Sequence, residues 1–393
     1  MEPIYLDHSA TTPVDPEVLG AMMRFFGNRF GNPSSIHGFG REARQAVEAA
    51  RAQTAALIGA APDEIVFTGG GTESVNIALM GVAFAAPSGK NHIITSAVEH
   101  HAVLNTCKYL QTRNFEVSCL PVDAGGLVDP EAVRRAVTEK TLLISVMHAN
   151  NEIGTIEPVS EIGRIARGRG ILMHTDAVQS VGKIPVRVDD LNVDLLSLAG
   201  HKLYGPKGTG ALYIRKNTPV APILFGGRQE GGRRAGTENV PGIVGLGKAC
   251  EIAAAELPSR ADRLKTLRGI LEEQIRERIP ETTINGDPHH ALPHILSVSI
   301  RSVSGDSVVR ELDRQGIAAS AGAACSAETV RISHVISALN LPRDFAMGTV
   351  RFSLGKGNRE EELVHAAGVL AGIIGKLRAM AELEASLGGR GCR

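Results

Sequence analysis

A lysine follows a short apolar run in the stretch 194-DLLSLAGHKLYGPKG-208. The run 195–198 predicts a buried strand, and Lys202 comes shortly after its end among glycines and a proline. Small residues at such a point let the backbone approach a ligand closely. A lysine amine withdrawn from water loses its proton more readily and can then form a Schiff base with an aldehyde. A solvated loop lysine is the alternative interpretation when Lys202 is considered alone.

A glycine-rich turn follows another predicted strand. The strand 64–68 is followed by 69-GGGTES-74, in which Thr72 opens a predicted helix directly after the glycines. Free backbone N–H groups at a helix start form a cradle for an anion such as phosphate. The turn is not a Walker motif, because no Gly-Lys-Ser/Thr follows it. A glycine turn with a threonine N-cap is the simpler alternative.

Three more predicted strands end close to polar side chains. These strands lie at 92–96, 141–147 and 171–175, and the groups that follow them are His100, Asn150, Asn151, Asp176 and Gln179. Taken singly, Asp176 is also explained as an N-cap and His100 as a partly buried histidine with its hydrogen bonds satisfied. A buried carboxylate is costly unless a cation or several donors face it. The gathering of polar groups at neighbouring strand ends therefore favours a common site.

Strand ends of this kind meet at one edge of an open α/β sheet, which is where ligands bind. An aldehyde cofactor with a phosphate would use every group described. The helix start would hold the phosphate, Lys202 would form the imine, and Asp176 would keep a pyridine nitrogen protonated. The flat ring of His100 would stack on the cofactor. These residues predict pyridoxal 5′-phosphate.

The pattern that must position these residues alternates strands with helices. Apolar strands that alternate with helical spacing favour an α/β fold with a mainly parallel sheet covered on both faces. The seven predicted strands are 64–68, 92–96, 115–120, 141–147, 171–175, 194–198 and 211–214, and helices are predicted at 101–112, 130–139 and 158–168.

A long helical stretch, 239–279, leads from this sheet to a second region. That region has predicted strands at 295–300, 317–320 and 350–354 and helices at 304–315 and 358–383. We expect an irregular N-terminal segment, 1–20, that packs on the smaller domain. The large cofactor domain is predicted at 21–259 and a smaller α+β domain at 260–393.

The composition excludes several classes of protein. The 393 residues carry 42 Lys plus Arg and 42 Asp plus Glu, so a basic surface for nucleic acid or an anionic membrane is not expected. No apolar run approaches the roughly 20 residues that span a bilayer, and no secretory signal is recognised. The cysteines form no CxxC pair, so we expect no metal site and a reducing cytoplasmic location. They are Cys107, Cys119, Cys250, Cys325 and Cys392.

Ordered motifs along nearly the whole chain resemble those of the NifS/IscS-like cysteine desulfurases. These enzymes belong to the class V aminotransferase group, with the fold of type I pyridoxal-phosphate-dependent transferases. The matching stretches are 5-YLDHSATTPVDPEV-18, 31-GNPSSIHGFG-40, 98-VEHHAVL-104, 147-MHANNEIGT-155, 174-HTDAVQSVGK-183, 200-GHKLYGPKGTGALY-213, 232-GRRAGTEN-239 and 350-VRFSLGK-356. The resemblance implies a large domain with a seven-stranded sheet and a smaller C-terminal domain.

The resemblance also implies which residues contact the cofactor. The implied contacts are the imine at Lys202, phosphate contacts at Gly71, Thr72 and His201, ring contacts at Asp176, Gln179 and His100, and an orienting contact at Asn151. His100 would in addition transfer protons. Thr237 matches a threonine that reaches the phosphate of the partner subunit, which implies a homodimer.

The implied reaction converts L-cysteine to L-alanine. Arg351, with Asn151, would bind the substrate, because a planar guanidinium suits a carboxylate. Cys325 lies in 320-SAGAACSAETV-330, whose small residues favour a mobile loop. It would attack the substrate sulfur as a thiolate and keep it as a persulfide. The sulfur would pass to an acceptor protein, such as a scaffold for iron–sulfur clusters. The alternative interpretations are an exposed cation for Arg351 and a small buried hydrophobe for Cys325.

Two other functions are compatible with the residues. A selenocysteine lyase or another class V aminotransferase would share the cofactor site and would not need Cys325. A protein that has lost catalysis and serves as a scaffold for cluster assembly would not bind the cofactor through Lys202.

Overall fold

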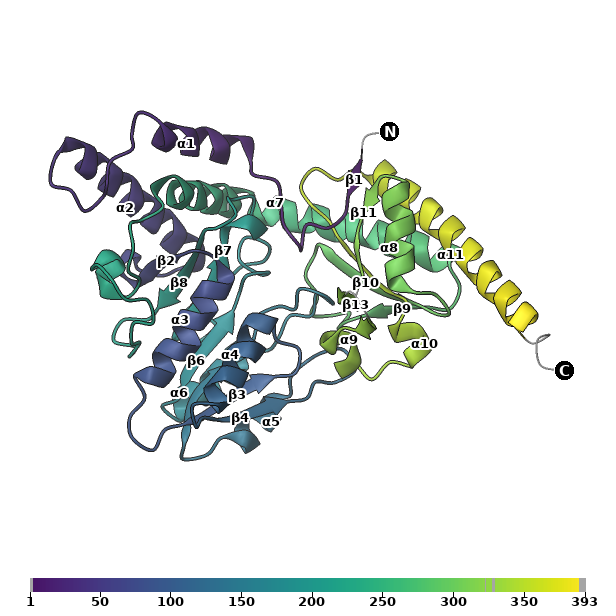
Figure 1. Cartoon of the computed structure of the whole chain (residues 1–393), viewed down its shortest axis with the longest axis horizontal. Helices are drawn as coiled ribbons and strands as arrows, with labels where there is room; N and C mark the ends of the chain where they lie inside the picture. Colours follow the sequence, from purple (N-terminus) through teal and green to yellow (C-terminus); the bar gives the residue numbers. More distant parts are fainter. Residues whose placement is uncertain (1–2, 322, 327–328, 389–393) are drawn as a thin grey trace.

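The computed structural model describes the backbone of residues 3–321, 323–326 and 329–388, and it describes their side chains except in 322–331 and 384–393. Its largest layer is a seven-stranded sheet (Figure 1). The strand order is β2 (Ile65–Thr68), β8 (Gly210–Ile214), β7 (Leu195–Ala199), β6 (Leu172–Asp176), β5 (Thr141–Ser145), β3 (His92–Ser96) and β4 (Glu116–Leu120). Strand β8 runs antiparallel to β7 and β2, and the other pairs are parallel. The predicted α/β fold with a mainly parallel seven-stranded sheet is confirmed.

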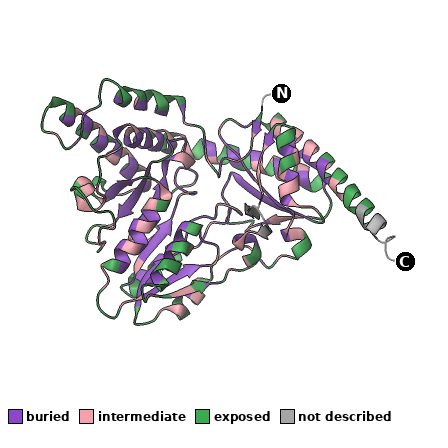
Figure 2. Cartoon of the chain, viewed as in Figure 1, coloured by how far each residue is buried: buried purple, intermediate pink, exposed green. Residues whose placement is uncertain are grey.

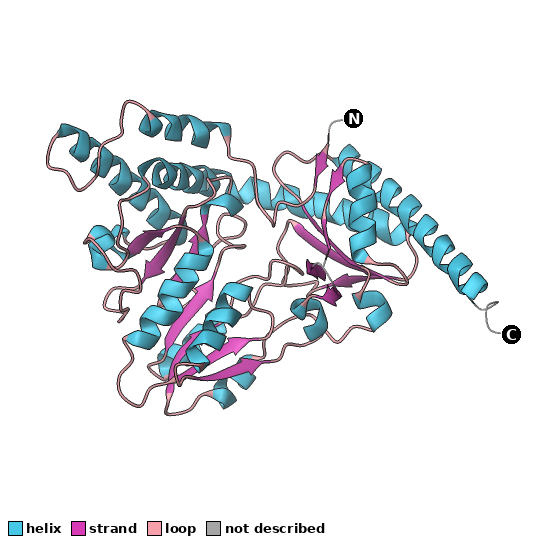
Figure 3. Ribbon diagram, viewed as in Figure 1, coloured by secondary structure: helices cyan, strands magenta, loops and turns pink. Residues whose placement is uncertain are grey.

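Helices cover both faces of this sheet (Figure 3). One face packs on α3 (Gly71–Phe84) and α4 (His101–Gln111). The other packs on α1 (Pro16–Phe26), α2 (Gly38–Ile58), α5 (Pro130–Ala136), α6 (Val159–Gly168) and the first half of α7 (Val240–Arg278). Because successive side chains of a strand point to opposite faces, Leu143 enters the first core and Ile144 the second. Both faces are apolar for this reason, and the strands other than the edge strand β4 are buried along almost all of their length (Figure 2).

A second, antiparallel sheet has the order β12 (Ser320–Ala321), β15 (Thr349–Ser353), β10 (Ile295–Ile300) and β9 (Thr282–Asn285). Its core includes side chains from the second half of α7, from α8 (Gly305–Arg314) and from α11 (Glu360–Gly388). The N-terminal strand β1 (Ile4–Tyr5) pairs in parallel with β11 (Ile317–Ala318), and Ile4 and Leu6 enter the same core. Helix α7 therefore contributes to both cores, with Pro258 inside it.

Two segments differ from the sequence-based expectation. The first 20 residues are not irregular throughout, because α1 begins at Pro16 with the Asp15 side chain accepting from the Glu17 N–H. The segment around Cys325 was expected to be a loop, and it forms strand β13 (Ala323–Ser326) paired with β14 (Thr329–Ile332). The remaining short helices are α9 (His334–Ala338) and α10 (Arg343–Ala346), with 3₁₀ turns η1 (Pro62–Glu64), η2 (Gly200–Lys202) and η3 (Gln229–Gly232).

Among the described residues, α11 alone is long and apolar enough to cross a membrane, over Glu360–Leu383 at a mean hydropathy of 1.4. The helix begins with three glutamates and packs against α7 and α8, and the most apolar stretch is 33% buried. A core helix of a soluble protein meets the same criteria, so this single helix is weak evidence for a membrane span.

Candidate active site

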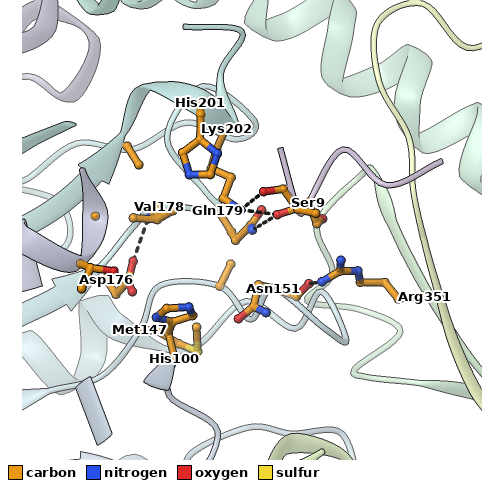
Figure 4. A pocket seen from close by; sticks show the side chains of 15 residues that line it. Ser9, His100, Met147, Asn151, Asp176, Val178, Gln179, His201, Lys202 and Arg351 are labelled. Carbon is orange, nitrogen blue, oxygen red and sulfur yellow. Dashed lines mark hydrogen bonds between the residues drawn. The ribbon is translucent and has the colours of Figure 1, made fainter. Parts of the chain in front are cut away.

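A cavity of about 270 Å³ lies at the carboxyl edge of the large sheet (Figure 4). Its lining residues are Ser9, Ala10, Gly71, Thr72, His100, Met147, Ala149, Asn151, Asp176, Val178, Gln179, Ala199, His201, Lys202 and Arg351. Nine of the eleven residues predicted from the sequence for the site are among them. Strands β2, β3, β5, β6 and β7 end at this edge, and the chain segments that follow them supply most of the lining.

Lys202 ends the short turn η2 directly after strand β7, and its side chain enters the cavity. The amine donates to the backbone carbonyls of Ser9 and Ala10, the latter at 2.7 Å. Burial and, second, the nearby positive charge of Arg351 lower the pKa of Lys202 from 10.5 to about 8, against the opposite effects of Asp7 and Asp176. A substantial fraction of the amine is therefore neutral and nucleophilic near neutral pH.

Asp176 and His100 face the same cavity from two neighbouring segments (Figure 4). Asp176 is buried at the end of β6 and accepts from the Val178 N–H at 3.0 Å, and burial raises the pKa of the carboxyl above its ordinary value. Such a carboxylate is stabilised by a cation placed against it. His100 is the N-cap of α4, and its Nδ1 accepts from the Ala102 N–H at 3.1 Å. In the neutral ring the proton is then on Nε2.

The glycine turn before α3 packs closely on the segment that follows Asp176. A Cβ added to Gly71 would lie 2.8 Å from a methyl carbon of Val178, so only glycine fits without a shift. Gly70 has a φ of 142°, which side chains rarely adopt. The Glu73 carboxylate accepts from the Gly69 N–H at 3.0 Å and from Arg234 at 2.8 Å. These contacts hold the turn with the first N–H groups of α3 directed at its open end.

Two further polar side chains complete this wall of the cavity. Gln179 donates from Nε2 to the Ser9 carbonyl at 2.9 Å, while its Oε1 is buried without a protein partner. His201 lies beside Thr11, with Nδ1 3.2 Å from the hydroxyl oxygen. Burial, followed by the charges of Lys202 and Lys207, lowers the pKa of His201 to about 4, so the ring is neutral.

Arg351 enters the cavity from strand β15 of the second sheet. Its Nη1 donates to the Asn151 carbonyl at 2.9 Å and its Nη2 contacts Asp7 Oδ1 at 2.7 Å. The remaining donor, Nε, is buried without a partner. One guanidinium therefore joins the two sheets, and it keeps an unused donor at the cavity.

These groups fit pyridoxal phosphate. Ser9 Oγ, Gln179 Oε1 and Arg351 Nε are all buried, unpaired and attached to cavity-lining residues, which leaves hydrogen-bonding capacity for a polar ligand. The cavity joins a helix start for a phosphate, a carboxylate for a pyridinium nitrogen and an amine for an aldehyde. Among the described residues, no group of three or more His, Cys, Asp or Glu side chains is arranged to hold a metal ion.

Two predicted site residues do not line the cavity. Thr237 is exposed in the loop before α7. Cys325 has its backbone in β13, but its side chain lies outside the described part of the chain.

The N-terminal segment supplies three groups to the site that were not predicted from the sequence, namely Asp7 and the carbonyls of Ser9 and Ala10. The polar run 7-DHSATTP-13, directly after the apolar stretch 4-IYL-6, was the signal that could have identified them.

Comparison with known proteins identifies similar chains along almost the full length. The family model described as aminotransferase class-V matches residues 4–365. A cysteine desulfurase IscS of Dictyoglomus turgidum is 52% identical over 375 residues, which cover 95% of this chain and 95% of the relative. One of Methanosarcina thermophila is 49% identical over 380 residues, covering 97% and 94%. A solved structure of a NifS-like protein superimposes with a TM-score of 0.90 at 41% identity, covering 95% of this chain and 99% of that one.

Proposed function

The chain belongs to the aminotransferase class V family and is a pyridoxal phosphate-dependent cysteine desulfurase, and on this premise we propose which of its residues bind the cofactor, seat L-cysteine and accept the sulfur. The observation that carries the proposal is the Lys202 amine, with a pKa lowered to about 8, in one cavity with Asp176, His100 and Arg351. When bound there, the cofactor supplies an electron sink that permits cleavage of the carbon–sulfur bond.

We assign the binding of the cofactor to three parts of the cavity. Gly71 and Thr72, at the start of α3, bind the phosphate through backbone N–H groups and a hydroxyl, and His201 and Gln179 border the same space. Asp176 holds the proton on the ring nitrogen, because a buried carboxylate favours a cation beside it. Lys202 attaches the cofactor through its amine.

His100 and Arg351 act on the substrate. The imidazole of His100 is fixed by its Nδ1 contact to the Ala102 N–H. Its flat face would stack on the cofactor, and Nε2 is left to move a proton to or from the substrate. Arg351 binds the carboxylate of L-cysteine, and Asn151, whose carbonyl holds the guanidinium, orients it.

Cys325 accepts the sulfur. Its thiolate attacks the substrate sulfur, the carbon–sulfur bond breaks, and L-alanine leaves while the sulfur stays on Cys325 as a persulfide. The position of Cys325 in β13 supports this role, because β13 follows β12 in the chain and Ser320 of β12 pairs with Arg351 of β15. An acceptor protein of the cytoplasm, such as an iron–sulfur scaffold, then takes the sulfur.

Mass spectrometry tests this assignment. After incubation with L-cysteine, the peptide that contains Cys325 should carry an added sulfur, and Cys325→Ala should abolish both the added sulfur and sulfide release. Cys119→Ala is the matched control, because Cys119 is an exposed free thiol on the edge strand β4 and does not line the cavity. Sulfide release that survives in Cys325→Ala would favour a lyase that does not need this thiol.

We also propose that the active form is a homodimer in which Thr237 reaches the phosphate of the partner. Thr237 is exposed away from its own cavity, and Thr72 also borders a surface groove of about 540 Å³ between α3 and α4. Large apolar side chains are exposed on and near α1, which supports a buried partner surface. They are Leu19, Met23, Phe26, Phe30, Ile36 and Phe39.

Sedimentation analysis tests the dimer. Phe26→Asp should shift the protein toward the monomer and lower cofactor retention, since Phe26 is 64% exposed in the single chain. Met380→Asp is the control, because Met380 is an exposed apolar residue on α11, 58% exposed, and lies outside the groove between α3 and α4. A monomeric wild-type protein with full activity would contradict the proposal.

A further inference from the structure

A carboxylate of the chain itself lies on the arginine proposed to bind the substrate carboxylate. Asp7 Oδ1 is 2.7 Å from Arg351 Nη2, although 344 residues separate the two in the sequence. The side chains are 18% and 11% exposed, so solvent screens the pair only weakly. Asp7 therefore already makes the kind of contact that an amino-acid substrate must make.

The geometry of the guanidinium makes this contact competitive with substrate. A carboxylate can bind a guanidinium in a bidentate manner through Nε and Nη2 or through Nη1 and Nη2, because Cδ blocks the third side. Both arrangements include Nη2, the atom that contacts Asp7. Nη1 is engaged by the Asn151 carbonyl and Nε is unpaired, so the free face consists of Nε and Nη2.

The backbone on either side fixes Asp7 in this position. Asp7 forms an isolated bridge with Ser353, two residues after Arg351, and the flanking His8 N–H donates to the Ser353 carbonyl at 3.0 Å. The Ser9 N–H donates to the Ser353 hydroxyl at 2.8 Å. The Ser320 hydroxyl donates to the same Asp7 oxygen at 2.9 Å. The backbone contacts on either side of Asp7 and the Ser320 hydroxyl therefore keep the Asp7 carboxylate beside Arg351.

The same N-terminal segment also engages the reactive amine. The carbonyls of Ser9 and Ala10 accept from Lys202, directly after Asp7 and His8 in the chain. One short segment therefore contacts both Arg351 and Lys202, the two basic groups that the substrate carboxylate and the cofactor would engage.

We propose that Asp7 is a positioning residue that occupies Arg351 in place of the substrate carboxylate and releases the guanidinium when substrate binds. Two carboxylates on the shared Nη2 would repel each other, which favours exchange over sharing. The proposal rests on the assignment of Arg351 as the carboxylate site. It assigns Asp7 a role in setting the affinity for amino acids, because each binding event must first break the Asp7–Arg351 contact.

Inhibition of the holoenzyme by two small molecules tests the exchange. L-Alanine carries the carboxylate, and ethylamine is the same molecule without it. Asp7→Asn keeps an oxygen that accepts from Arg351 and Ser320 but removes the competing charge, so the inhibition constant of L-alanine should fall about tenfold. The inhibition constant of ethylamine should not change. A value for L-alanine that is unchanged or higher would overturn the proposal, since a purely orienting Asp7 predicts weaker binding.

Two variants separate this proposal from the assignment on which it rests. Arg351→Gln should raise the inhibition constant of L-alanine and leave that of ethylamine unchanged. If it does not, Arg351 is not the carboxylate site and both assignments fail. Asp15→Asn is the matched control, because Asp15 lies in the same segment and pairs with Lys356 instead. It should leave the ratio of the two inhibition constants as in the wild type.

A crystal structure of the wild-type holoenzyme with L-alanine provides a measurement that does not depend on any variant. The Asp7–Arg351 contact, 2.7 Å without substrate, should lengthen beyond hydrogen-bond distance while the alanine carboxylate lies on Arg351. A contact that persists beside the bound carboxylate would overturn the exchange.

Discussion

The pH at which Lys202 becomes reactive follows directly from its surroundings. Burial lowers the pKa of its amine from 10.5 to about 8. At about pH 7.5 an amine with the ordinary pKa is roughly 0.1% neutral, whereas one with a pKa of 8 is roughly 24% neutral. The cavity thus increases the neutral fraction about 200-fold. The same shift corresponds to about 3.4 kcal/mol of preference for the neutral amine.

Stopped-flow mixing of the apo-protein with pyridoxal phosphate measures this reactivity. The rate of cofactor uptake is followed by absorbance between pH 6.5 and 10.5 and is divided by the rate at which a small lysine analogue reacts with the cofactor at the same pH. This ratio should change with pH and show an inflection near pH 8. Arg351→Gln should move the inflection to higher pH, because the Arg351 charge lowers the pKa of Lys202. Arg276→Gln, on the exposed surface of α7, is the control and should not move it.

An inflection near pH 10 in the wild-type protein would refute the argument from burial. An inflection that moves to lower pH in Arg351→Gln would refute the electrostatic part. Uptake that is unaffected by Lys202→Ala would remove Lys202 from the site altogether.

Three further predictions concern stability. Burial raises the pKa of Glu99 from 4.5 to about 8, so between these pH values the carboxyl is protonated in the folded state and ionised in the unfolded state. The free energy of unfolding therefore falls as pH rises through this range. Glu99→Gln should make the urea midpoint fall less steeply with pH. Burial lowers the pKa of Lys183 from 10.5 to about 7, so Lys183→Met should raise stability by a few kcal/mol at pH 7, and a gain that does not shrink toward pH 10 would contradict this. Ile144→Ala, in the fully buried centre of β5, should cost about 2–5 kcal/mol in a denaturant titration, whereas a loss below about 1 kcal/mol would show that this core is not tightly packed.

Much of the site could be predicted because its residues follow strands with a clear apolar pattern. The runs that became β6 and β7 are short, buried and bounded by polar or glycine residues, so the positions of Asp176 and Lys202 at strand ends were evident. Parallel strands bring such ends to one edge, which is why separate segments could be expected to converge. The start of α1 at Pro16 was missed even though Asp15 and Pro16 form a regular helix start.

The sequence by itself determined the order of strands and helices, the residue types at the strand ends and the cofactor that they suit. These depend on local patterns of apolar and polar residues, which act over a few positions. Only the tertiary structure decided that the carbonyls of Ser9 and Ala10 receive the Lys202 amine and that Asp7 contacts Arg351. Those contacts join segments that lie 192, 193 and 344 residues apart in the chain. Both the contacts and the lowered pKa of Lys202 exist only once packing has excluded water from the cavity.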